Sequence, residues 1–479
     1  MKYLLTTFIT IFLSLSAFSQ NVTWSKVFGV SNTENIAEIL GNDEFYFVIT
    51  NTTSKLQITK FDNSLSFIMN KEFDLASNEI SSIKQVKLAG DKIYAAAISD
   101  ANNELSVQFI TLNLNLEIEG TREVTSHKYE SDRNKGAFKF SISPNEKNIL
   151  VMEELPKVKD RNEEISLMAF THEEGLIWQK KIDTKYPGKL IRHNKSFIDN
   201  KGSGYVLKRF KGPKGFTFKL YCFDVNAGKA VAKTIKLDNK KIGEIDATFN
   251  QSDQLVVTGF YGGDSFEIYK GIFYFLYKSD GTQIKKYYDK IGVSYLAKFI
   301  GKKAASKDGA GLSDFYITDL VSVSDDKTII IAEKNKDFWD NSKKGKFRIF
   351  ESGDLALLCL GKDGNVVWKE IINKNQNSFN DNSFWNSYNY LTTDKAIYIY
   401  GNEVNSTVKE PQNGPYNVLG DMVTLKGDEI AVLKSNYLKN HPNKGMILVP
   451  SKGLRKNNEL VFVVSNKEKS KVALGKLNH

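Results

Sequence analysis

Short segments in which apolar and polar residues alternate dominate the chain. They are rich in Val, Ile, Tyr, Phe and Thr and are separated by Asn, Asp, Gly and Lys, a pattern typical of β-strands. Only eight Pro occur in 479 residues, and few stretches have the period of a helix. The pattern therefore predicts an all-β protein. Clear examples are EFYFVIT (44–50), KIYAAAI (92–98), NILVMEE (148–154), TIIIAEK (328–334) and AIYIYGN (396–402).

The strand ends repeat at intervals of about 50 residues, with about four strands in each interval. This period is the signature of a β-propeller, in which each repeat forms one blade. We expect eight blades, with seven as the alternative, because the match is weak at Gly120 and Ala431. Aligned on the Trp of VVWKEII (366–372), the final strands of the repeats bring together Trp24, Met69, Gly120, Trp178, Ala232, Ile284, Trp368 and Ala431. Trp24, Trp178 and Trp368 are predicted to pack between blades.

The N-terminal segment VTWSKVF (22–28) resembles the last strand of a repeat, although it stands at the start of the chain. After the eighth copy, the C-terminal region supplies three further strands, in the stretches MILVPSKGLR (446–455), ELVFVVSN (459–466) and KVALGKL (471–477). We therefore predict that the N-terminal strand closes the last blade as its outermost strand. Closure of this kind leaves no long unpaired sheet edge.

Residues 1–19 have the pattern of a secretory signal peptide. One charge at Lys2 precedes an apolar run and the small-residue pattern Ala17-Phe18-Ser19, and the run is too short to cross a membrane. We expect an exported protein of the periplasm, the outer-membrane surface or the medium, with no transmembrane segment in the mature chain. Residues 20–479 are predicted to form a single propeller domain.

One repeat interval of 84 residues, between Ile284 and Trp368, indicates an insertion. VSYLAKFIGKK (293–303) places apolar residues on one helical face and is followed by a Gly-rich loop. A helical insertion near 290–313 is the expected result.

Charge and composition argue against nucleic-acid binding and against a disulfide. The net charge of +10 comes almost entirely from Lys, with seven Arg, dispersed among 56 acidic residues. Lys lacks the bidentate geometry of Arg, so a solvated surface is favoured over binding to nucleic acid. Cys222 and Cys359 lie inside apolar strands and are predicted to be buried free thiols.

No motif of a known catalytic or cofactor site occurs. The five His residues lack the spacing of metal ligands, and no nucleophile elbow, phosphate loop or paired zinc motif is present. We therefore assign no catalytic residue, no metal and no cofactor, and the sequence favours a protein without enzymatic activity.

The stretch 334–354 is unusually aromatic and basic for a loop. Trp and Arg are common at the centres of binding interfaces, which makes Phe338, Trp339 and Arg348 candidate binding residues. Tyr261 and Trp385, in or next to other predicted loops, complete the candidate set. The alternative is that the aromatic residues of this loop fold back onto the core of their own blade.

Two stretches resemble a family of uncharacterised exported β-propeller proteins common in Bacteroidota. QLVVTGFYGG with KGIFYFLYKSDGTQI (254–284) is similar to its fifth-blade pattern, and NVVWKEIINKNQNSFNDNSFWNSYNYLTTDKAIYIYGNE (365–403) to a following Trp strand. The chain has Asp381-Asn382-Ser383 where the family usually has Asp-Gly-Gly. The resemblance implies a propeller and export, and it brings no assigned activity.

These observations support two functional hypotheses. The first is a binding or scaffolding module of the cell envelope that presents one face of the ring to a protein or glycan partner. The alternative is a carbohydrate-binding protein or glycoside hydrolase that uses the mouth of the ring, where aromatic side chains stack on sugars.

Overall fold

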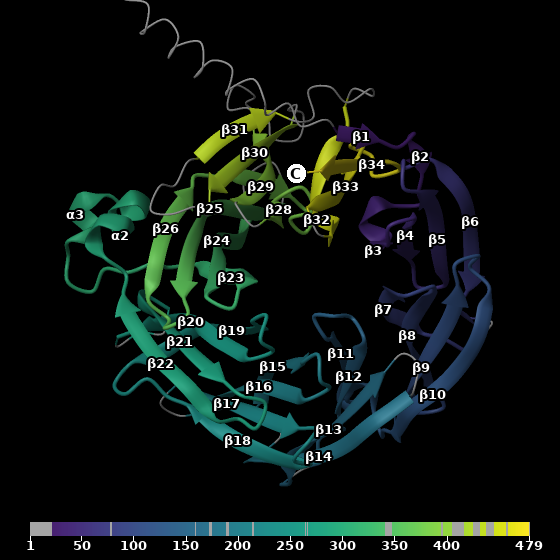
Figure 1. Cartoon of the computed structure of the whole chain (residues 1–479), viewed down its shortest axis with the longest axis horizontal. Helices are drawn as coiled ribbons and strands as arrows, with labels where there is room; N and C mark the ends of the chain where they lie inside the picture. Colours follow the sequence, from purple (N-terminus) through teal and green to yellow (C-terminus); the bar gives the residue numbers. More distant parts are fainter. Residues whose placement is uncertain are drawn as a thin grey trace, which may run out of the picture. The chain divides into compact units, whose positions relative to one another are not determined.

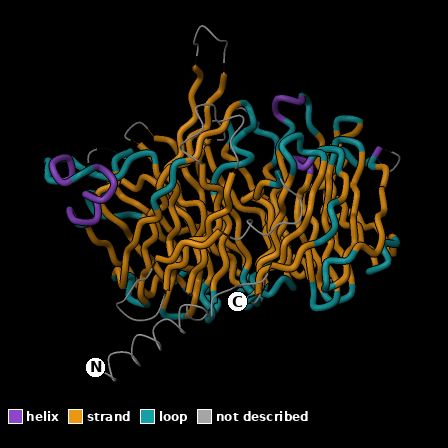
Figure 2. The backbone as a smooth tube through the Cα atoms, turned by 90° about the horizontal axis from the view of Figure 1, so that it is seen from above, coloured by secondary structure: helices purple, strands orange, loops and turns teal. Residues whose placement is uncertain are grey.

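The computed structural model describes most of the chain after residue 21. The described residues are 22–76, 79–158, 160–171, 175–187, 191–212, 215–263, 265, 267–340, 347–393, 396–404, 416–424, 432–436, 445–456 and 458–478. The predicted signal peptide, residues 1–19, lies outside them. Most of the described backbone is strand, with a few short helical segments (Figure 2).

The described residues form eight antiparallel sheets. In seven of them, four strands follow one another in chain order, each paired with the next, which is the strand order of a propeller blade. The fold class is all-β, a β-propeller, as the sequence predicted. No helix in the described ranges is long and apolar enough to span a membrane.

The chain divides into two compact units. Unit 1 contains residues 1–50, 59–70 and 381–479, and unit 2 contains residues 51–58 and 71–380. Five complete sheets belong to unit 2 (Figure 1). Clusters of buried apolar side chains fill the space between each pair of consecutive sheets in this unit.

The strands of unit 2 form sheets β7–β10, β11–β14, β15–β18, β19–β22 and β23–β27. Their bounds are β7 (Ser82–Ala89), β8 (Lys92–Ala101), β9 (Glu104–Asn113), β10 (Ile118–Lys128), β11 (Ala137–Ile142), β12 (Asn148–Glu154), β13 (Asn162–Thr171), β14 (Gly175–Pro187), β15 (Ile191–Ile198), β16 (Gly204–Gly212), β17 (Gly215–Asp224), β18 (Lys229–Ile235), β19 (Lys241–Phe249), β20 (Leu255–Gly262), β21 (Tyr269–Tyr277), β22 (Gln283–Lys290), β23 (Phe315–Ser324), β24 (Lys327–Asp340), β25 (Phe347–Gly361), β26 (Val366–Ile372) and β27 (Gln376–Phe379).

The remaining three sheets involve unit 1, and strands β5 and β6 contribute residues to both units. Their strands are β1 (Val22–Trp24), β2 (Phe28–Gly29), β3 (Ile36–Gly41), β4 (Phe45–Asn51), β5 (Lys55–Asp62), β6 (Phe67–Asp74), β28 (Tyr388–Thr392), β29 (Ala396–Val404), β30 (Tyr416–Thr424), β31 (Val432–Asn436), β32 (Ile447–Lys456), β33 (Glu459–Ser465) and β34 (Lys471–Asn478). In the described ranges, 3₁₀ turns at Thr33–Asn35 and Asp132–Asn134 lie in the connections between strands.

The N-terminal strand completes the C-terminal sheet, whose strand order is β1-β34-β33-β32. Val22 lies opposite Leu477 and Trp24 opposite Gly475, and β2 continues the pairing at Phe28. The predicted closure of the last blade by VTWSKVF is therefore confirmed. Trp24 itself is half-buried, and its ring meets that of Phe462 edge-on at 5.5 Å between centroids.

The repeated Trp packs between sheets where it is best preserved. In β14, Trp178 directly follows a bulge, and its ring packs at a tilt of 39° against Phe223 of the next sheet, with 4.1 Å between ring centroids. Its indole N–H donates to the carbonyl of Gly202 at 2.7 Å. Gly120 has the same register after a bulge in β10. There the guanidinium of Arg122 takes over, 5.6 Å from the ring centroid of Phe170 in the next sheet.

Two short helices lie in the segment predicted as a helical insertion. They are α2 (Val293–Ile300) and α3 (Lys302–Ala305), and Gly301 separates them with a φ of 79°, a value that favours glycine. Tyr295 anchors α2 by donating its hydroxyl hydrogen to the carbonyl of Glu370 at 2.9 Å. Leu296 joins the apolar cluster between sheets β19–β22 and β23–β26.

Both cysteines are buried and unpaired, as predicted. Burial raises the pKa of Cys222 to about 12 and that of Cys359 to about 11. Neither thiol is therefore activated as a nucleophile.

Candidate binding site

The β24–β25 hairpin is longer than the sheet that carries it. β26 pairs with β25 only over residues 355–360, whereas β24 and β25 continue to pair as far as Asp340 and Phe347. Over this extension β27 replaces β26 as the neighbour of β25, from Ser352 to Ile349. The result is a small three-stranded extension, which we call the hairpin extension (residues 335–340, 347–352 and 376–379).

A buried ion pair braces the base of the hairpin extension. Lys374, in the connection between β26 and β27, pairs with Glu333 of β24 and donates to the side-chain oxygen of Gln376 at 2.9 Å. Burial lowers the pKa of Lys374, and the charge and hydrogen bond of Glu333 oppose this shift. Because a buried charge without its partner is costly, the pair holds the extension to the sheet in one arrangement.

One face of the hairpin extension combines an exposed indole with an ordered guanidinium. Trp339 is 54% exposed and lies opposite Arg348 in the strand register. The Nε atom of Arg348 donates to a carboxylate oxygen of Asp337 at 3.0 Å, and its guanidinium lies 5.0 Å from the ring centroid of Phe350. Arg348 is therefore already oriented, which reduces the entropy lost when it binds a partner.

Phe338 occupies the opposite face, because neighbouring residues of a strand point to opposite sides. It is 44% exposed and pairs in register with Ile349. Phe350 is buried, so the alternative prediction that loop aromatics cover their own blade describes this residue. The side chain of Phe347 lies outside the described residues. Three of the five candidate residues therefore lie on the hairpin extension: Trp339 and Arg348 on one face and Phe338 on the other.

Tyr261 and Trp385 do not belong to this site. Tyr261 is 3% exposed and lies in an apolar core of unit 2, where its ring covers Gly271 so closely that a Cβ there would come within 2.3 Å of its hydroxyl oxygen. Trp385 is 7% exposed and packs in the core of unit 1, edge-on to Phe384. We therefore remove both from the candidate site. The sequence had placed them in or next to loops, whereas Tyr261 lies within strand β20 and Trp385 lies in a buried turn.

Sequence reasoning missed the residues that position the site. The role of Asp337 could not be predicted, because its contact with Arg348 depends on the register of the hairpin. The pair of Lys374 and Glu333 could not be predicted either, because these residues are 41 positions apart in the sequence. The available signal was the set of aromatic residues in this stretch (Phe338, Trp339, Phe347 and Phe350), because aromatic residues are enriched in strands and would have favoured paired strands over a loop.

A second group of charges lies in unit 2, deep between sheets. Lys208 of β16 is completely buried and pairs with Glu163 of β13. Burial lowers the pKa of Lys208 and raises that of Glu163, and the mutual attraction opposes both shifts. Because Lys208 has no exposed surface, the pair has no route to a substrate and acts in packing. Among the described residues no cluster of three His, Cys, Asp or Glu has the geometry to hold a metal ion.

Comparison with known proteins finds similar propeller structures but no matching protein family. No protein-family model matches the chain, and no curated protein is similar in sequence. Among solved structures, the chain is similar to the WD40 domain of SCAP from fission yeast, with 9% identity, a TM-score of 0.42 and coverage of 96% of this chain and 94% of that one.

Two further structures show similarity at the same level. The β-propeller domain of the Trilobed protease from Pyrococcus furiosus has 10% identity, a TM-score of 0.41 and coverage of 87% of this chain and 99% of that one. The polysaccharide lyase Uly1 has 11% identity, a TM-score of 0.39 and coverage of 82% and 89%. Similarity at this level does not indicate a shared ligand or reaction.

Proposed function

We propose that the protein is an exported β-propeller that serves as a binding or scaffolding module of the cell envelope, with the hairpin extension as its contact element for a protein partner. The observation that carries this proposal is the exposed Trp339 beside an Arg348 already fixed by Asp337. Trp and Arg dominate the energetic centres of protein interfaces, and oriented side chains lose less entropy on binding.

The rigid base of the extension supports the same function. The strand ladder to β27 and the Lys374–Glu333 pair connect the exposed residues to a four-stranded sheet rather than to a free loop. Contact residues held in this way keep their geometry between the free and the bound state.

Export and blade number form part of the proposal. The apolar run before Ala17-Phe18-Ser19 supports a signal peptide, and hence a protein of the periplasm, the outer-membrane surface or the medium. We assign one blade to each of the eight sheets formed by the described residues and retain seven as the alternative count.

Carbohydrate binding is the second candidate, and the exposed face of Trp339 favours it. An indole flanked by a carboxylate and a guanidinium offers a stacking surface with hydrogen-bonding groups beside it. Glycoside hydrolysis would need two carboxyl groups about 5 to 9.5 Å apart across a bound sugar. Asp337, the carboxylate next to the indole, is engaged by Arg348, which makes binding the better-supported form of this candidate.

A comparison of two exposed aromatic residues tests the proposal. Tyr316 of β23 is 49% exposed in the same sheet, so Tyr316→Ala is a matched control for Trp339→Ala. Immobilised mature protein is exposed to envelope extract, and retained proteins are quantified by mass spectrometry. We expect a specific set of proteins to be lost with Trp339→Ala and with Arg348→Ala and kept with Tyr316→Ala.

The same variants separate the two candidates. A glycan array with signals that Trp339→Ala removes, together with an unchanged protein set, would replace the protein partner by a carbohydrate. Equal retention by the Trp339 and Tyr316 variants, with no glycan signal, would contradict the assignment of the hairpin extension.

A further inference from the structure

The helical insertion of unit 2 has exposed apolar side chains in addition to those that pack on the sheets. In α2, Tyr295 and Leu296 are buried, whereas Val293 is 54% exposed and Ile300 is 38% exposed. Val293 and Ile300 are seven residues apart, and a helix returns to nearly the same side after seven residues. One side of α2 therefore packs on its sheet, and another presents two aliphatic side chains to solvent.

The insertion is firmly attached to unit 2, so these side chains keep their orientation. The hydroxyl of Tyr295 donates to the carbonyl of Glu370 at 2.9 Å. Beyond α3, Tyr269 and Leu312 exchange backbone hydrogen bonds of 2.8 and 2.9 Å. Figure 1 shows α2 and α3 projecting outward beside β26. An element that projects and is fixed at both ends can meet a flat surface without rearrangement.

Positive charge accompanies the exposed aliphatic side chains. Residues 291–314 contain four Lys and two Asp, with no Arg and no Glu. Lys298 pairs with Glu370 of β26 at 3.2 Å, and Asp314 pairs with Lys336 of β24 at 3.0 Å. The other three Lys are exposed and form no ion pair with any residue that the structure describes: Lys302, Lys303 and Lys307. Only one acidic residue of the insertion, Asp308, is left to offset them.

A basic surface built from Lys alone matches a lipid surface better than a protein. Lys is depleted at protein–protein contacts, where Arg and aromatic residues are enriched. The phosphates of an anionic bilayer present negative charge without a fixed geometry, and Lys clusters on an amphipathic helix are attracted to it. Aliphatic side chains such as Val293 and Ile300 enter the boundary between headgroups and acyl chains. The helical insertion thus complements an anionic bilayer in charge and in polarity.

We propose that the helical insertion rests on an anionic lipid surface. Val293 and Ile300 enter the bilayer at the level of the headgroups, and the Lys residues that follow α2 lie against the lipid phosphates. The contact is shallow and reversible, because two aliphatic side chains bury little apolar area. It is separate from the hairpin extension and does not depend on the partner proposed for that element.

Co-sedimentation with vesicles tests the proposal. Sucrose-loaded vesicles contain either phosphatidylcholine alone or equal parts of phosphatidylcholine and phosphatidylglycerol, and the full mature protein is added at increasing NaCl concentration. We expect affinity about tenfold higher for the vesicles with phosphatidylglycerol. This preference should shrink as NaCl is added, because salt screens the attraction between Lys and the lipid phosphates.

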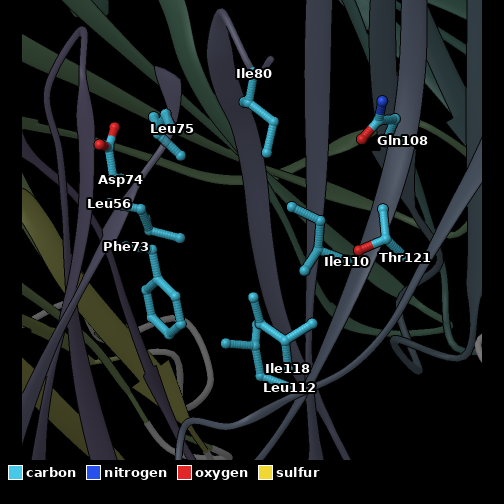
Figure 3. A pocket seen from close by; sticks show the side chains of 10 residues that line it. All are labelled: Leu56, Phe73, Asp74, Leu75, Ile80, Gln108, Ile110, Leu112, Ile118 and Thr121. Atoms are coloured by element: carbon cyan, nitrogen blue, oxygen red, sulfur yellow. The ribbon is translucent and has the colours of Figure 1, made fainter. Parts of the chain in front are cut away.

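Two exposed apolar residues are compared by a change to Glu. Val293→Glu places a charge where the side chain enters the bilayer, and an acidic residue in the first turn is compatible with the helix. The control is Ile118→Glu, because Ile118 of β10 is 50% exposed and lines an apolar pocket with Leu112 and Phe73 (Figure 3). Val293→Glu should weaken vesicle binding about tenfold, whereas Ile118→Glu and Trp339→Ala should leave it unchanged.

Charge-matched variants separate a defined contact from general adsorption, which the net charge of +10 makes necessary. The insertion variant replaces Lys302, Lys303 and Lys307 by Gln. Its control replaces three exposed Lys of β14 and β18 by Gln: Lys180, Lys181 and Lys229. The insertion variant should bind the anionic vesicles about tenfold more weakly, and its control should change binding by less than about twofold. Thermal melting shows that all variants are folded.

Four results would overturn the proposal. Absence of binding, or equal binding to both vesicle types, would exclude an anionic lipid contact. Equal weakening by the two Lys variants would mean general adsorption of a basic protein. Loss of binding with Trp339→Ala but not with Val293→Glu would move the lipid contact to the hairpin extension. Envelope proteins that Val293→Glu fails to retain, without any binding to vesicles, would make the insertion a contact for protein.

Discussion

Gly475 lies directly opposite Trp24 in the ladder between β34 and β1. A Cβ at this position would come within 2.7 Å of the indole ring, so only glycine lets the ring lie against the sheet and reach Phe462. The backbone on either side is tightly connected, because Ser25 and Leu474 exchange two hydrogen bonds of 2.9 Å through the amide and hydroxyl of Ser25.

Deleting residues 21–30 should make the protein insoluble or lower its melting temperature sharply. The deletion removes every β1 and β2 hydrogen bond and leaves β34 as a long open edge. Trp24→Ala alone should cost about 2 kcal/mol, roughly half the loss for a fully buried Trp. Gly475→Ala should also be destabilising, because the added Cβ would come within 2.4 Å of the Phe462 ring and 2.7 Å of the Trp24 ring.

Lys26→Ala is the control for these variants, since Lys26 is exposed in the same segment. Differential scanning calorimetry compares the four variants with the unmodified protein. Melting of the deletion variant at the temperature of the unmodified protein would show that the pairing of β1 with β34 does not contribute to stability.

The Lys208–Glu163 pair should show strong coupling. Lys208→Met should destabilise the protein by about 3 to 5 kcal/mol, because it leaves the carboxyl group of Glu163 buried without its partner. The double variant Glu163→Leu with Lys208→Met should recover most of this loss, since neither charge remains.

Urea unfolding of the two single variants and the double variant gives the coupling energy. Lys211→Met, at an exposed position of the same strand, serves as the control. Additive effects of the two single changes would contradict a direct interaction between the side chains.

His127 should make stability dependent on pH above about 6.5. Its ring is held between a carboxylate oxygen of Glu153 and the carbonyl of Lys135, each at 2.8 Å. Burial acts to lower the pKa of His127, but the hydrogen bonds to Glu153 and Lys135, with the charges of Glu153 and Glu104, outweigh it and raise the pKa above the usual 6.5. A raised pKa in the folded state means that the stabilisation is complete below 6.5 and is lost as the pH rises through the folded value.

Melting temperatures between pH 5.5 and 8.5 test this dependence. The difference between the unmodified protein and His127→Gln should be largest at the acidic end and should shrink as the pH rises. A difference that grows with pH would mean that His127 is neutral in the folded state.

The two thiols should be inert in the folded protein and reactive after unfolding. Burial at Cys222 and Cys359 hides both sulfur atoms and raises both pKa values, to about 12 and about 11, so very little thiolate forms at neutral pH. Ellman's reagent should detect two thiols in denaturant without reductant and almost none in buffer. Detection of no thiol in denaturant would indicate a disulfide and would contradict the placement of Cys222 and Cys359 in two different sheets.

Much of the architecture could be predicted because it depends on local pattern. The alternation of apolar and polar residues identified the strands. Aligning the repeats on the Trp of VVWKEII (366–372) located their outer strands, including the bulge position shared by Trp178 and Gly120. The candidate binding site was harder to predict, because residues 335–340 and 347–352 form strands only through their pairing with each other, which the sequence does not state. Trp339 was found from its type, whereas Tyr261 was misplaced because burial of an aromatic ring is decided by its neighbours, here Gly271.

At the repeat position where Trp178 stands in β14, β10 has Gly120, and a different side chain makes the contact to the next sheet. Where the Trp is lost, Arg122 reaches Phe170 of the next sheet and Gly175 approaches its guanidinium closely. A charged side chain thus replaces an aromatic one at the same junction, which explains why a weak match in the repeat still corresponds to a well-formed sheet.

The pairing of β1 with β34 also determines when the protein finishes folding. Ser25 and Leu474, which bond to each other, are 449 residues apart, so nearly the whole chain must leave the ribosome before the first strand finds its neighbour. Contacts of such long sequence separation form slowly, because the intervening chain must first be ordered. During synthesis the segment around Trp24 remains an unpaired strand, and it needs protection from other chains until β34 has been made.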